Sequence, residues 1–170
     1  MVRRTEHEPL KEPENAYTWE RAKVGDKAPG SVEEEVRMDR IQQYVDGEDD
    51  YHRLYVDPEF AKRYGFTSVA IPFMMTVRVA ADRRQEIARA RGMGGLGRPT
   101  PYTHLEVRTY APLNVGDVIT STCEIARKEE RRERHYLTRH IVGYNQKGQK
   151  VIEYWKTNLW DAGKPGDRLR

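Results

Sequence analysis

The chain has 170 residues, of which 37% are hydrophobic and 34% charged, and its formal net charge is +3. This length fits one domain and leaves little room for a second. A single cysteine, Cys123, excludes an internal disulfide and a Cys-x-x-Cys metal site. Residues 69–75, the longest apolar stretch, are too few to cross a bilayer, and residues 1–13 hold no apolar signal segment. We therefore expect a cytoplasmic protein with no membrane partner.

Three arginines form a basic run at positions 131, 132 and 134, but glutamates at 129, 130 and 133 interleave with it. Such a mixture is typical of a solvated strand pair or turn. Nucleic-acid binding requires an unopposed basic face with aromatic platforms, which the sequence lacks. We therefore expect no nucleic-acid partner, while the small basic excess is compatible with a phosphate-bearing substrate.

In chain order, residues 1–23 are polar and form a predicted N-terminal arm, which Tyr17 and Trp19 anchor to the body or to a second subunit. The Val24-Gly25-Asp26 turn then leads into a first strand near residues 31–38. Asp39 is a good N-cap for a short helix over residues 40–45. Residues 47–55 are polar and turn-like.

A second short helix is predicted from Asp57 as N-cap and Pro58 at the first helical position, ending at Arg63 before Gly65. Pro72 begins the longest helical pattern, with apolar residues at helical spacing to about residue 90. The glycine-rich residues 92–97 follow this helix, whereas a nucleotide-binding glycine loop lies between a strand and a helix.

Alternating patterns predict strands over residues 104–110, 118–126, 136–144 and 151–159, with a hairpin turn at residues 145–148. Residues 24–161 therefore form one α+β domain in which a long helix packs on an antiparallel sheet, and residues 162–170 are a frayed polar tail.

Three segments, residues 50–59 (DYHRLYVDPE), 70–74 (AIPFM) and 110–117 (YAPLNVGD), together resemble the MaoC-like branch of the hot-dog superfamily. Residues 50–59, DYHRLYVDPE, stand where the family has a GDxNPxHxDPE-type segment. Residues 70–74, AIPFM, stand at the start of the long central helix, and residues 110–117, YAPLNVGD, match the family's RPVxxGD turn. The resemblance covers residues 24–160 and implies a hot-dog fold, in which an antiparallel sheet wraps around a long helix.

The resemblance implies a hydratase/dehydratase of 2-enoyl/3-hydroxyacyl thioesters of CoA or acyl carrier protein, with no cofactor. The family's catalytic Asp falls on Asp50 and its His on Tyr55, whose ordinary pKa near 10 makes it a poor base at neutral pH. His52 is a nearby substitute, and Pro72 takes the place of a small residue whose N–H holds the thioester oxygen. The residues predicted to bind substrate are Ile71, Pro72, Phe73, Met74 and His104, although Met74 also fits the core.

Two alternatives remain. The Tyr-x-Asp-Pro pattern at Tyr55 followed by Pro72 resembles the supporting hot dogs of two-part dehydratases, which complete the sheet and shape the acyl tunnel for a catalytic partner. The chain is then half of a homodimer or of a heterodimer. A weaker alternative is a thioesterase with an acidic residue on the long helix, although Asp82 and Glu86 among arginines fit salt bridges better. No spacing of histidines and acids predicts a metal site.

Overall fold

The computed structural model describes residues 13–160. Residues 13–30 pack on the body of the domain. Tyr17 is buried and its carbonyl accepts a hydrogen bond from the Trp160 indole N–H (3.1 Å), while the indole of Trp19 stacks on His135 at 4.0 Å between ring centroids. The expectation that Tyr17 and Trp19 anchor this segment to the body is therefore confirmed, and the domain boundaries at residues 23 and 161 stay predictions.

The first helical region contains α1 (Met38–Glu48), α2 (Arg53–Val56) and α3 (Pro58–Lys62), and it follows the short strand β1 (Val32–Glu35). The expected N-cap of α1 was wrong. Arg37 occupies that position, and Asp39 lies in the first turn, where it pairs with the Arg37 guanidinium. Helix α1 is also longer than expected and ends where Asp49 takes a left-handed conformation at φ 54°.

The start of α3 agrees with the sequence prediction. The Asp57 side chain accepts a hydrogen bond from the N–H of Phe60 (2.9 Å), and Pro58 occupies the first turn, where its missing N–H costs nothing. Gly65 follows the helix at φ +87°, a conformation that glycine adopts without strain.

The central helical segment is interrupted, which corrects the expectation of one helix over residues 72–90. It consists of a short 3-10 helix, η1 (Phe73–Met75), then α4 (Thr76–Val79) and, after a break at residues 80–83, α5 (Arg84–Ala90). At the break, the Tyr154 hydroxyl donates to the carbonyl of Ala80 (2.7 Å) and the N–H of Ala81 donates to Oγ of Ser121 (3.2 Å). These side chains of the sheet replace hydrogen bonds that a continuous helix would make.

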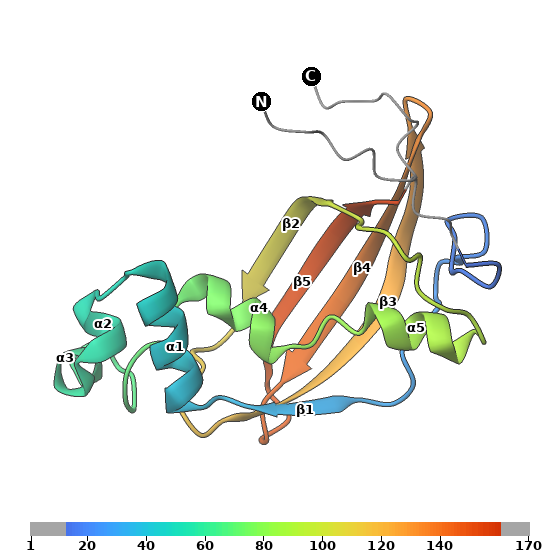
Figure 1. Ribbon diagram of the computed structural model, residues 1–170. Helices are drawn as coiled ribbons and strands as arrows, with labels where there is room; N and C mark the ends of the chain where they lie inside the picture. The colour runs from blue at the N-terminus through green and yellow to red at the C-terminus, as the bar shows by residue number, and fades with distance from the viewer. Residues whose placement is uncertain (1–12, 161–170) are drawn as a thin grey trace, which may run out of the picture.

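The sheet has five antiparallel strands in the order β1-β3-β4-β5-β2, and α4 and α5 lie across one of its faces (Figure 1). Its other members are β2 (Tyr102–Thr109), β3 (Val118–Arg131), β4 (Arg134–Tyr144) and β5 (Lys150–Leu159). The mixed-charge run at residues 129–134 is the tip of the β3–β4 hairpin, as the sequence indicated.

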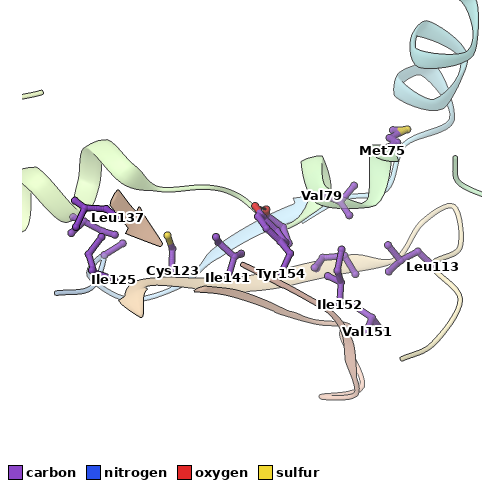
Figure 2. Packing of buried hydrophobic residues seen from close by; sticks show 14 of the residues in the cluster. Met75, Val79, Leu113, Cys123, Ile125, Leu137, Ile141, Val151, Ile152 and Tyr154 are labelled. Atoms are coloured by element: carbon purple, nitrogen blue, oxygen red, sulfur yellow. Dashed lines mark hydrogen bonds between the residues drawn. The ribbon is translucent and has the colours of Figure 1, made fainter. Parts of the chain in front are cut away.

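The core lies between the sheet and the helical segment, and Figure 2 shows its side chains in that layer. Gly143 allows the break to approach the sheet. A Cβ there would lie 2.9 Å from Cγ2 of Ile152 and 3.3 Å from Cβ of Ala80, closer than side chains normally pack. The fold is the expected α+β hot dog, with its central helix in pieces. Among the described residues, no helix is both long and apolar enough to span a membrane.

Candidate functional site

Asp50 and His52 lie in the exposed connection between α1 and α2. The N–H of His52 donates to Oδ1 of Asp50 (3.3 Å), and the N–H of Leu54 donates to Nδ1 of His52 (3.3 Å). His52 is thus the N-cap of α2. Both side chains are engaged with the local backbone in turn and cap contacts, which are common for these residue types at such positions.

Tyr55 is half-buried and packs against the hydrophobic core. Its ring lies 5.8 Å from that of His52, measured between centroids and tilted by 59°. The structure thus brings Asp50, His52 and Tyr55 into one short stretch. Among the described residues, however, no hydrogen bond joins a carboxylate to an imidazole there.

An apolar groove of about 470 Å³ lies beside Tyr55, and we call it the Tyr55 groove. The backbone holds its wall together, because the N–H of Ala70 donates to the carbonyl of Leu54 (2.7 Å). Its lining residues are Leu54, Tyr55, Phe66, Ala70, Ile71, Phe73, Thr76, Thr109, Tyr110, Ala111, Pro112 and Leu113. The groove can accommodate a short acyl chain, because apolar surface dominates its wall.

The start of the central helical segment is divided between two cavities. Ile71 and Phe73 line the Tyr55 groove, whereas Met74 lines a separate cavity of about 650 Å³ between α4, β2 and β5. Pro72 is buried at the N-cap position of η1 and has no N–H to donate. The predicted substrate-binding residues therefore share one segment but face different spaces.

His104 lies apart from this region. It is exposed on β2, opposite Thr157 of β5, and it lines neither the Tyr55 groove nor the cavity beside Met74. Its predicted role in substrate binding stays a prediction.

Asp82 lies in the break, outside any helix, and the Arg139 guanidinium binds its carboxylate through two hydrogen bonds of 2.7 and 3.0 Å. Lys156 adds a contact of 3.2 Å. Burial alone would raise the pKa of Asp82, but the adjacent Arg139 and Lys156 outweigh it and lower that pKa. Glu86 pairs with Arg83 at 2.5 Å. Both carboxylates are thus in salt bridges, as the sequence favoured, which removes support for the thioesterase alternative.

The residues that sequence reasoning missed are those of the far wall of the Tyr55 groove, residues 109–113. The YAPLNVGD turn that begins at Tyr110 marked this segment as a family feature, but nothing local indicated that it would face Tyr55. Among residues 13–160, no group of three or more His, Cys, Asp or Glu side chains is arranged to hold a metal ion.

Comparisons with known proteins agree with this architecture. Residues 22–154 match the family model described as the FAS1-like dehydratase domain region. None of the curated proteins matches the sequence.

Among solved structures, a monoamine oxidase regulatory protein from Archaeoglobus fulgidus is similar at a TM-score of 0.70 and 21% identity, over 86% of this chain and 95% of that one. The R-hydratase PhaJ1 from Pseudomonas aeruginosa is similar at 0.62 and 16% identity, over 91% and 97%. A chain of the HadBC (3R-hydroxyacyl-ACP dehydratase) complex from Mycobacterium tuberculosis is similar at 0.63 and 14% identity, over 81% and 94%.

At these identities the solved structures show the shared hot-dog fold alone. The family match covers most of the described chain, from the end of the N-terminal segment to the middle of β5. The chain therefore belongs to the FAS1-like dehydratase family, and it has the hot-dog fold.

Proposed function

We propose that this chain is a subunit of a hydro-lyase that acts on 2-enoyl/3-hydroxyacyl thioesters of CoA or acyl carrier protein, together with a second hot-dog chain that carries the Asp/His pair. One observation carries the proposal. The apolar Tyr55 groove is present, whereas Oδ1 of Asp50 and Nδ1 of His52 accept hydrogen bonds from the neighbouring backbone.

The chemistry explains why this arrangement favours a supporting role. Addition of water across an enoyl bond needs a group that takes a proton from the water molecule near neutral pH and delivers a proton to the carbon chain. Histidine is the usual side chain for this step, and Tyr55 stands where the family has it. Pro72 adds no N–H at the helix start to stabilise the oxygen of the thioester.

The groove itself contributes binding. Each methylene that leaves water for an apolar wall gains about 0.8 kcal/mol, so even a four-carbon chain would be held measurably. Binding of this kind acts on substrate and transition state alike, and a partner with the acid–base pair must supply the selective stabilisation of the transition state.

Assembly with a second hot dog follows from the free edge of the sheet. Within residues 13–160, strand β2 pairs with β5 alone, so we propose that its outer backbone groups accept another strand. The HadBC structure is a complex by name, and we propose a similar two-chain arrangement here.

A second candidate is catalysis by the chain alone, with Asp50, His52 and Tyr55 as its catalytic groups. It is favoured by their proximity, because the His52 ring lies 5.8 Å from the ring of Tyr55, which itself lines the Tyr55 groove. A small rotation of His52 away from its capping position would free its imidazole.

Hydration of crotonyl-CoA, followed as loss of enoyl absorbance, tests both candidates. The purified chain should be inactive alone and should gain activity when mixed with a hot-dog chain of the same organism that carries an intact Asp-x4-His. Activity of the mixture should survive Asp50→Asn, because asparagine also makes the turn contact to His52.

Asp49→Asn is the matched control, since asparagine tolerates the left-handed conformation of Asp49. Turnover by the chain alone that Asp50→Asn abolishes and Asp49→Asn leaves intact would support the second candidate and reject the first.

A further inference from the structure

A cavity of about 340 Å³ lies against α5, and we call it the Trp160 pocket. Its walls come from the N-terminal segment at Tyr17, from α5, from residues 95–99 and from Trp160 directly after β5. It shares no lining residue with the Tyr55 groove or with the cavity beside Met74, so it is a separate site.

The floor of the Trp160 pocket is buried and mostly apolar, and its rim is exposed. The floor consists of Tyr17, Ala88, Leu96 and Trp160. The exposed rim includes Gly95, Gly97 and Pro99. A small ligand can therefore enter past the rim and bury apolar surface on the floor, as ligands do in most small-molecule sites.

Two aromatic side chains form a corner of this floor. The rings of Tyr17 and Trp160 lie 6.4 Å apart between centroids and are inclined at 88°. The indole N–H of Trp160 donates to the carbonyl of Tyr17 (3.1 Å), which fixes the corner. Such an edge-to-face pair presents one ring face and one ring edge, and both make favourable contacts with a further aromatic ring.

The charge of the Trp160 pocket is positive. Arg84 and Arg98 line it, and none of the described residues that line it is acidic. Arg98 holds the rim in place, because its Nη2 atom donates to the carbonyl of Trp160 (2.7 Å). An anionic ligand would therefore meet no carboxylate on the described walls of the pocket.

Arg84 is the cation best placed for such a ligand. It donates to the Thr100 hydroxyl and its guanidinium carbon lies 5.8 Å from the centre of the Trp160 ring, but within residues 13–160 it has no hydrogen bond or ion pair to a carboxylate. Burial, and then the like charge of Arg139, lower the pKa of the Arg84 guanidinium. An anion beside Arg84 would offset both effects.

We propose that the Trp160 pocket binds a small aromatic carboxylate, in a site that goes beyond the proposed hydro-lyase function. The carboxylate pairs with Arg84, since a guanidinium binds carboxylate oxygens through paired N–H donors. The ring lies against Tyr17 and Trp160. A small inorganic anion fits this pocket poorly, because the apolar floor gives it no hydrogen bonds in exchange for those to water.

Isothermal titration calorimetry at constant ionic strength tests the proposal, with hydrocinnamate as the probe and hydrocinnamamide as its neutral analogue. Wild-type protein should bind hydrocinnamate at least tenfold more tightly than the amide. Arg84→Gln should weaken binding of hydrocinnamate about tenfold or more, because it removes a charged donor. Arg89→Gln is the matched control: it removes the same charge from the same helix at an exposed residue that does not line the Trp160 pocket, so it should bind as wild type does.

Tryptophan fluorescence tests where the probe binds. Hydrocinnamate should change the emission of the wild-type protein and of Trp155→Phe, because Trp155 stacks on His140 and does not line the pocket. The change should be lost in Trp160→Phe. A thermal melt shows that each variant is folded.

Four results would overturn the proposal. They are no binding of hydrocinnamate by the folded wild-type protein, equal affinity for the amide, equal affinity in Arg84→Gln, and binding of inorganic phosphate as tight as that of hydrocinnamate. The probe carries no thioester and the readout is binding. The result therefore stands whether or not turnover of enoyl-CoA is found.

Discussion

Glu153 is a carboxylate buried on the face of the sheet that is turned away from the helices. Its neighbours on β5, Ile152 and Tyr154, point into the core, so the alternation of the strand places Glu153 on the other face. Its side chain is only 7% exposed and binds Lys150 (2.5 Å), His140 (3.3 Å) and the Tyr110 hydroxyl. Burial alone would raise the pKa of Glu153, but the hydrogen bonds from Lys150, Tyr110 and His140 lower it to about 2.

A pKa below the ordinary value of 4.5 links Glu153 to acid stability. The ionised carboxylate stabilises the folded state fully above the unfolded pKa, and this contribution is lost as pH falls from 4.5 toward about 2. At pH 7 we expect Glu153→Gln to lower the free energy of unfolding by about 2 kcal/mol, and we expect the deficit to shrink below pH 4.5. Urea titrations at pH 7, 5, 4 and 3 would measure it.

Glu124→Gln is the control, because Glu124 is half-exposed and lies 3.9 Å from His140. A similar pH dependence in this variant, or a constant deficit in Glu153→Gln, would contradict the account.

At the scale of elements, the sequence predicted the strands and helix ends that depend on residues close together along the chain. The alternating patterns located strands β2 to β5, and Asp57 and Pro58 located the start of α3. The break at residues 80–83 was missed, because residues 76–90 contain no proline or glycine. Its causes are distant in sequence: Ser121 lies 40 residues away from Ala81, and Tyr154 lies 74 away from Ala80.

The candidate site was likewise predicted only where local motifs mark it. Motif positions placed Tyr55, Ile71 and Phe73 together, and the structure gives them one groove. The far wall at residues 109–113 depends on how the sheet meets the helical segment. No local pattern encodes that packing.

Single substitutions of the sheet residues that bind the break should therefore destabilise the fold. We expect Tyr154→Phe to lower the free energy of unfolding by about 1–2 kcal/mol, because the buried carbonyl of Ala80 loses its donor. Tyr144→Phe, at an exposed tyrosine on β4, should change it by less than about 0.5 kcal/mol. Urea unfolding measures both, and equal effects would mean that the hydroxyl does not hold the break.

At the scale of the whole molecule, the proposed assembly depends on which edge of the sheet a second chain would meet. The sheet has two edges, and β2 is the longer one, with eight residues against the four of β1. The N–H of Tyr110, directly after β2, points inward to the carbonyl of Val151. Because N–H directions alternate along a strand, the N–H of Val107 points outward, where a second strand would pair.

This geometry gives a test of the proposed assembly that leaves the ladder to β5 intact. We expect Val107→Pro to weaken association, with itself or with a catalytic hot dog, more than tenfold relative to Val107→Ala, because only proline removes the outward N–H. Alanine matches the loss of the half-buried isopropyl group, so the comparison isolates the backbone donor. Sedimentation velocity over a concentration series measures the association, and circular dichroism confirms the fold of both variants. If the two variants associate equally well, the partner does not add a strand to β2, and the cavity beside Met74 or another face must form the contact.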